Sequence, residues 1–152
     1  MSIWWSLHLR REAASVPLAR RLLLGTMETA GVDPDVSYEL SVALTEACAN
    51  AVEHGGGGGS RVPGGAPSEA YRVTAYLDGE TCRIEVADSG PGFPGRAVRP
   101  VPSDEAEHGR GLRLIEELAD HVQFGNRSGR GGAVVSFDKI LKWRDSPSLL
   151  LA

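Results

Sequence analysis

The chain has 152 residues, of which 41% are hydrophobic and 24% charged, and its formal net charge is -4. This length predicts one domain whose core is large enough to fold without disulfides or structural metals. The acidic balance argues against a general nucleic-acid binder and against a protein that binds anionic membranes. No apolar run is long enough to span a membrane, and no apolar stretch follows Arg10-Arg11 as it would in an export signal.

The first 54 residues predict one strand and two helices. Residues 3–10 alternate between apolar and polar side chains, which is typical of a half-buried strand. A helix is expected to begin at Ser15, as its N-cap, and to end at Gly31. A second helix is expected over 34–54, because Pro34 suits the first turn and apolar residues follow at helical spacing.

Glycine dominates the segment that follows these helices. Five consecutive glycines at 55–59 lead into a stretch rich in Gly and Pro up to Pro67, which predicts a flexible loop. The glycines could be mistaken for a phosphate-binding P-loop. No Lys-Ser or Lys-Thr follows them, so that interpretation fails.

The second half predicts two hairpins and one helix. Residues 71–77 and 82–87 flank an Asp-Gly turn, and 122–124 and 133–137 form a similar pair. Between the hairpins, apolar residues from Leu112 onward indicate a helix. The segment 93–108 before that helix has no periodicity and is expected to be mobile.

Strands and helices mix without strict alternation, which predicts an α/β, two-layer sandwich. The sheet should be mixed or mostly antiparallel, with the helices on one face. We expect a single domain over residues 1–141 and a C-terminal tail over 142–152. Cys48 and Cys82 are far apart and form no CxxC pattern, so they predict two buried reduced thiols in a cytoplasmic protein.

The second helix carries polar residues where a packed helix would have Ala or Leu. Glu46 and Asn50 are four residues apart, which places them on one face, and His54 continues that line. Burying a carboxylate is costly unless a partner or ligand offsets it. Asn50 offers a neutral oxygen suited to Mg²⁺, and Glu46 is placed to accept a proton from an attacking hydroxyl. His54 is equally well explained by the favourable charge of a helix C-terminus.

Two glycine motifs follow in the chain. Asp88 ends a predicted strand and precedes Ser-Gly-Pro-Gly, where its carboxylate could accept a hydrogen bond from an exocyclic amine such as that of adenine. Gly90 and Gly92 would let the backbone approach the ring. The second motif, 109–112, is expected to open a helix. Its amides and Arg110 would then bind phosphates.

The three motifs in this order resemble the GHKL ATPase superfamily, which includes gyrase, histidine kinases and MutL, over about residues 35–137. Glu46 and Asn50 match the N-box, residues 88–92 the first glycine box and 109–112 the second. Within the superfamily the chain is most similar to the small anti-sigma-factor serine/threonine kinases. The brief segment between the glycine boxes and the absence of a phospho-accepting His helix point to that group.

The resemblance implies a Bergerat ATP-binding fold with a histidine-kinase-like ATPase domain that uses ATP and Mg²⁺. It implies a kinase that phosphorylates a Ser or Thr of a STAS-domain anti-anti-sigma protein and that also binds a sigma factor. Glu46 would be the catalytic base, Asn50 the Mg²⁺ ligand and Asp88 the adenine contact. The other nucleotide contacts would come from Gly90, Gly92, Gly109, Arg110, Gly111 and Leu112.

One departure from the family concerns its last motif, where Ala133 stands in place of an expected Thr near the adenine. This favours a rival interpretation, a catalytically weak or inactive module that sequesters a sigma factor or an antagonist. A second rival is a detached histidine-kinase catalytic domain. The pair Trp4-Trp5 fits either the interface of a homodimer or the packing of an edge strand, and both alternatives stay open.

Overall fold

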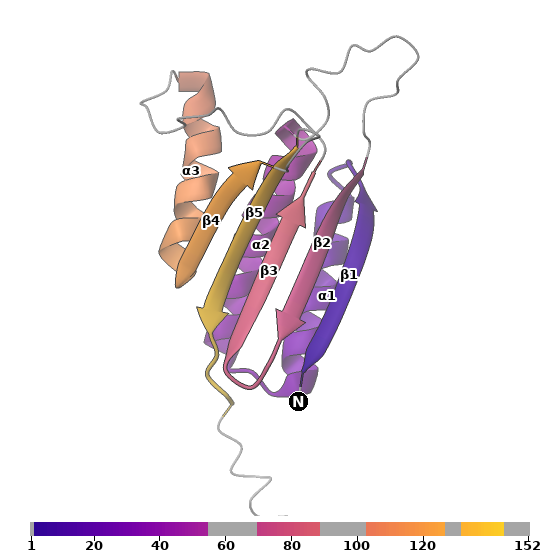
Figure 1. The fold of residues 1–152 in the computed structure, drawn as a ribbon, viewed down its shortest axis with the longest axis vertical. Coiled ribbons are helices and arrows are strands. Elements are labelled where there is room, and N and C mark those ends of the chain that lie inside the picture. Colours follow the sequence, from indigo (N-terminus) through magenta and orange to yellow (C-terminus); the bar gives the residue numbers. More distant parts are fainter. Residues whose placement is uncertain (1, 55–69, 89–102, 127–131, 145–152) are drawn as a thin grey trace, which may run out of the picture.

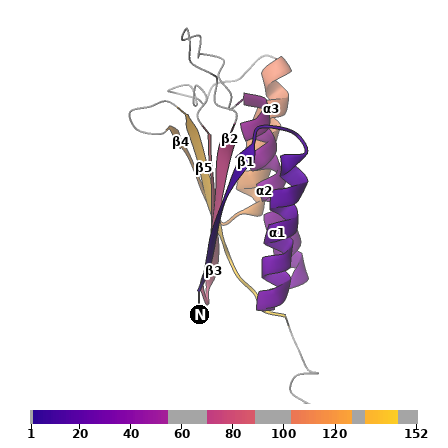
Figure 2. The ribbon, with the colours of Figure 1, turned by 90° about the vertical axis from the view of Figure 1, so that its right-hand side faces the viewer.

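The computed structural model describes residues 2–54, 70–88, 103–126 and 132–144. These residues form a five-stranded sheet with its helices on one face, as the sequence predicted (Figures 1 and 2). The elements in chain order are β1 (Ile3–Arg10), α1 (Ser15–Ala30), α2 (Pro34–His54), β2 (Ala70–Leu77), β3 (Thr81–Ala87), α3 (Ser103–Leu118), β4 (His121–Asn126) and β5 (Ala133–Ile140).

The sheet has the strand order β1-β2-β3-β5-β4, and each of these four pairings is antiparallel. The antiparallel alternative of the prediction is therefore the observed one. Because side chains alternate across a strand, each strand turns one set of residues toward the helices and the other set toward the open face. In β2 the buried set is Tyr71, Val73, Ala75 and Leu77.

The core lies between the sheet and the helices. Its fully buried side chains come from both layers, and each apolar group removed from water contributes to stability. The largest of them are Phe137, Leu23, Met27, Leu40, Leu44, Ile84, Ile115 and Val73. Both cysteines are free and buried in this core, as predicted. Burial raises the pKa of the Cys48 and Cys82 thiols to about 12.

The first helix ends as expected but begins differently. Gly31 takes a left-handed conformation with φ of 88°, and its N–H donates to the carbonyls of Met27 and Glu28. Ser15 is the first helical residue and not its N-cap, which corrects the prediction. The Ser15 hydroxyl donates to the Glu12 carbonyl and bonds the Tyr71 hydroxyl at 2.6 Å, so it joins the helix to β2.

Both predicted hairpins are present. In the β2–β3 turn, Asp78 Oδ1 accepts hydrogen bonds from the amides of Glu80 and Thr81, which explains why an Asp suits this turn. The predicted flexible loop at 55–67 lies outside the described residues. None of the described helices has the length and apolar character needed to cross a membrane.

The described part of the predicted tail contacts the turn between α1 and α2. The Asp33 amide donates to the Lys142 carbonyl at 2.8 Å, and the Arg144 amide donates to the Gly31 carbonyl at 2.7 Å. Val32 and Trp143 form an isolated antiparallel bridge. Residues 142–144 are thus held by backbone hydrogen bonds at the end of the sheet where β5 finishes.

Candidate nucleotide site

The polar stripe of α2 lies at the edge of the core. Glu46 and Asn50 are half-buried, while Ala47, Cys48 and Ala51 beside them are buried. The buried residues fix the rotation of the helix, so the two polar side chains are held on one face. His54, at the end of this line, is exposed.

Glu46 is in close contact with α3. A Cβ atom built on Gly111 would lie 2.9 Å from Glu46 Oε1, closer than real Cβ atoms approach an oxygen. The carboxylate therefore occupies space that only a glycine at position 111 leaves. This contact brings the first and the third sequence motifs together.

The position of the third motif within its helix was predicted wrongly. Residues 109–112 do not open a helix, because α3 begins at Ser103, six residues before Gly109. Of the segment 93–108, which was expected to be aperiodic and mobile, residues 103–108 are helical, and residues 93–102 lie outside the described residues. In this conformation the amides of 109–112 are inside the helix, where they bond carbonyls four residues earlier.

Asp88 follows the last residue of β3 and is buried, with 5% of its surface exposed. Its amide donates to the Ala133 carbonyl at 2.9 Å, and its Oδ1 accepts from the Ala133 amide at 3.1 Å. The carboxylate is therefore held in place by β5. Ala133, which the sequence identified as a departure from the family, contacts Asp88 through its backbone, so this contact does not depend on the missing hydroxyl.

The remaining predicted residues divide into three groups. Arg110 is exposed on α3, and Leu112 is half-buried and packs against the core. Gly109 lies within α3. Gly90 and Gly92 lie outside the described residues.

One contact of this region had no signal in the sequence. Arg11 Nη1 donates to the Val52 carbonyl near the C-terminal end of α2. A cation at this place is favourable because the carbonyls of a helix end carry partial negative charge. Arg11 joins the end of β1 to the helix that carries Glu46 and Asn50.

The described parts of the three motifs lie at one end of the molecule. The C-terminal end of α2, the end of β3 and the beginning of α3 lie together there (Figure 1). The amide oxygen of Asn50 and the carboxylate of Glu46 are oxygen ligands of the kind that Mg²⁺ binds. The buried carboxylate of Asp88 is a hydrogen-bond acceptor of the kind that an adenine amine requires. These residues fit a magnesium nucleotide. The amides of 109–112 are engaged in helical hydrogen bonds, so they could bind its phosphates only if this part of α3 were unwound. No three His, Cys, Asp or Glu side chains of the described ranges gather as a metal site.

Comparison with known families gives the assignment. Residues 9–139 match the family described as the histidine kinase-like ATPase domain. The chain belongs to this family. The match spans every element from the end of β1 to β5, so it includes all the candidate site residues. The family implies ATP binding, and the predicted resemblance is confirmed.

A curated relative supports the assignment. The chain is 30% identical over 120 residues to the serine-protein kinase RsbW of Bacillus subtilis (strain 168). The alignment covers 75% of this chain and 72% of that protein.

Two solved structures show the same fold. One contains the RsbU and RsbW domains of Rv1364c from Mycobacterium tuberculosis, with a TM-score of 0.62 and 21% identity. It covers 92% of this chain, which spans 34% of the other. The second is a chain of the SiaB-SiaC complex from Pseudomonas aeruginosa, with a TM-score of 0.56, 11% identity and coverage of 90% and 88%. At these identities the likeness concerns the fold alone.

Proposed function

We propose that this protein is an ATP-dependent serine/threonine-protein kinase that phosphorylates a STAS-domain anti-anti-sigma protein and so regulates a sigma factor. The observation that carries the proposal is the position of Glu46. Its carboxylate lies on a half-buried helix face one turn from Asn50 and against Gly111 of the neighbouring helix. The 30% sequence identity with a serine-protein kinase supports the same activity.

The chain's own residues would act by orientation and electrostatics. ATP with Mg²⁺ would supply the phosphoryl group and neutralise part of its charge. Asn50 would bind the metal through its amide oxygen, and Asp88 would accept a hydrogen bond from the adenine amine. Glu46 would orient the Ser or Thr hydroxyl of the partner and accept its proton, a role that requires hydrogen-bond contact with that hydroxyl.

The partner and the compartment belong to the same proposal. The small kinases that this chain resembles act on STAS-domain proteins and bind sigma factors, which is the basis for both partners. The two free thiols fit a reducing compartment, so we place the activity in the cytoplasm.

Transfer of label from ATP tests the proposal directly. The purified chain is incubated with γ-labelled ATP, Mg²⁺ and each STAS-domain protein from its native cells, and labelled proteins are identified by mass spectrometry. We expect an acid-stable phosphate ester on Ser or Thr of one partner. Acid-labile label on a His would indicate a detached histidine-kinase domain. Partner binding without label would contradict the kinase.

A second candidate is a binding module that sequesters its partner without phosphorylating it. The observation in its favour is the position of residues 109–112 inside α3, where their amides bond helix carbonyls. Calorimetry with MgATP separates the two candidates. A partner that binds this chain while MgATP does not bind it supports the module.

A further inference from the structure

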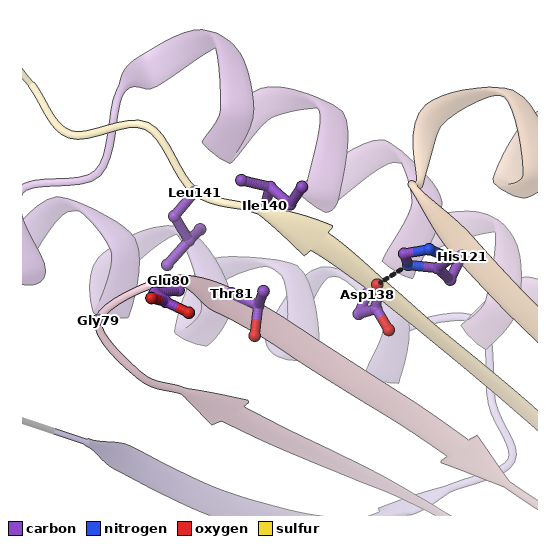
Figure 3. A pocket seen from close by; sticks show the side chains of 7 residues that line it. All are labelled: Gly79, Glu80, Thr81, His121, Asp138, Ile140 and Leu141. Atoms are coloured by element: carbon purple, nitrogen blue, oxygen red, sulfur yellow. Dashed lines mark hydrogen bonds and ion pairs between the residues drawn. The ribbon is translucent and has the colours of Figure 1, made fainter.

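Two groups of polar side chains outside the candidate site differ in what they contact. The first lies at a pocket of about 520 Å³ beside the β2–β3 turn, where His121 Nδ1 and Asp138 Oδ1 are 2.8 Å apart (Figure 3). This pocket is at the opposite end of β3 from Asp88. The second group lies at the corner between β1 and α1, residues 11–14, and it contacts α2. The corner is therefore in direct contact with the helix that carries Asn50.

The corner is fixed to the rest of the molecule by buried hydroxyl groups. The Ser15 amide donates to the Glu12 carbonyl at 2.9 Å, and the Ser15 hydroxyl donates to the same carbonyl at 2.7 Å. The hydroxyls of Ser15 and Tyr71 are 2.6 Å apart, and both residues are buried. Tyr71 also forms a side-chain hydrogen bond with Cys48 on α2. These contacts join the corner to β2 and to α2 at the position two residues before Asn50.

Arg11 joins the same corner to α2 at the position two residues after Asn50. Its side chain is half-buried, and Nη1 donates to the Val52 carbonyl. Arg11 Nε is buried and has no hydrogen-bond partner among the described residues. The preceding Arg10 is different, because its side chain is 83% exposed and lies 3.9 Å from Glu12. Burying part of a guanidinium is costly unless a hydrogen bond offsets the cost, and the bond to Val52 has this effect.

The contact of Arg11 falls where the core stops holding α2. Ala51 is the last buried residue of the helix, Val52 is half-buried, and residues 53 and 54 are exposed. The last four carbonyls of a helix have no partner within it, and helix ends fray. Val52 has one of these carbonyls, and Arg11 supplies its donor. In a helix the carbonyl of Asn50 accepts from the amide of residue 54, so fraying of the last turn would release the backbone of Asn50.

We propose that Arg11 is a positioning residue of the candidate site, which holds the last turn of α2 in helical form and so keeps Asn50 in place to bind the Mg²⁺ of the nucleotide. This inference rests on the proposed role of Asn50 and adds the residue on which that role depends. Glu46 is one turn further from the helix end and beside the buried Ala47, so its position depends less on Arg11. Loss of Arg11 therefore weakens nucleotide binding that depends on the metal and spares binding that does not.

Amide hydrogen exchange in the full chain tests the contact itself, without any nucleotide. Arg11→Gln removes the guanidinium, and we expect the amides of Glu53 and His54 to exchange at least about tenfold faster, because hydrogen bonds to charged groups are among the stronger ones. The matched control is Arg10→Gln, which makes the same chemical change one residue earlier in an exposed side chain. The control should leave these exchange rates unchanged.

Calorimetry of ATP binding, with Mg²⁺ and with EDTA, tests the consequence for the site. The apparent affinity of a ligand falls with the fraction of molecules in the competent conformation. We expect Arg11→Gln to reduce the gain in affinity that Mg²⁺ gives by at least about threefold and to leave the affinity in EDTA unchanged. Arg10→Gln removes the same charge and should leave the gain unchanged. In an Asn50→Ala background, Arg11→Gln should cause no further loss, because it acts through Asn50.

Three results would overturn the inference. One is equal exchange of the Glu53 and His54 amides in the wild type and in Arg11→Gln. Another is an unchanged gain from Mg²⁺ in that variant. The third is an equal loss of affinity with Mg²⁺ and with EDTA, which would mean that Arg11 contacts the nucleotide directly.

Two measurements keep the test decisive. Circular dichroism shows whether each variant is folded, and if Arg11→Gln is not, unprotected amides at 53 and 54 of the wild type would contradict the inference. A wild-type chain that binds no MgATP would contradict the proposed function, whereas the exchange rates would still decide whether Arg11 holds the last turn of α2.

Discussion

The two helices that carry the candidate site are held in the molecule in different ways. α2 buries side chains on each of its middle turns, from Val36 to Ala51. In the described side chains of α3, residues 110–118, only Ile115 is buried. Glu46 and Asn50 thus lie on a helix that is anchored along most of its length, while Gly111 lies on a helix with one fully buried side chain in its described part. A polar residue on a buried helix is a more secure candidate than a glycine on a surface helix.

The largest expected effect concerns α2. Glu46→Ala should keep nucleotide binding and reduce phosphoryl transfer by about 100-fold to 10,000-fold, because a general base contributes that much to a rate. Calorimetry with MgATP and label transfer to the partner measure the two properties. If the variant labels its partner at the original rate, Glu46 is not the base.

Asn50→Ala tests the second polar residue of the same helix. We expect it to abolish Mg²⁺-dependent nucleotide binding, since it removes the proposed protein ligand of the metal. Isothermal titration of MgATP into the variant measures the change. Asn50 is only half-buried, so the fold should be retained. Unchanged MgATP affinity would refute the assignment.

Gly111→Ala tests the contact between the two helices. Alanine is a better helix former than glycine, so the free energy of unfolding should rise by up to about 1 kcal/mol. The new methyl group must displace the Glu46 carboxylate, which ends a flexible side chain and can move. A displacement of this size should lower transfer about tenfold to 100-fold. Urea unfolding and label transfer measure both effects.

The matched control for this variant is Gly25→Ala on α1, where nothing lies within 4 Å of the added methyl group. The same gain in helix stability is expected there, with no change in transfer. If both variants transfer phosphate at the wild-type rate, the position of Glu46 does not depend on Gly111.

The smallest effect is a pH dependence of the free energy of unfolding, which appears only at alkaline pH. Burial raises the pKa of Cys48, on α2, and of Cys82, on β3, from 9.0 to about 12. Between these values the unfolded thiols lose their protons while the folded thiols keep them, so stability falls as the pH rises. The slope is about 1.4 kcal/mol per pH unit for each thiol.

Urea unfolding below pH 9 and between pH 9 and about 12 measures this loss. Cys82→Ala should make the slope shallower, because one buried thiol is removed. If the free energy of unfolding falls with pH no more steeply in the wild type than in the variant, burial does not raise the pKa of Cys82.

Local patterns were sufficient for most of the fold. Alternation along 3–10 predicted β1, and Pro34 and Gly31 predicted where α2 begins and α1 ends. For the site, the spacing of Glu46 and Asn50 was enough to place both on one face. These features follow from the period of a helix or a strand, which can be recognised from residues close together in the sequence.

Contacts between distant elements were settled by tertiary structure alone. The hydrogen bonds of Asp88 to Ala133 and the contact of Arg11 with α2 had no local signal. The sequence by itself determined which faces of the elements are apolar and which residue types could bind a nucleotide. Only packing decided how closely α3 approaches Glu46, because that distance depends on how the layers fit together.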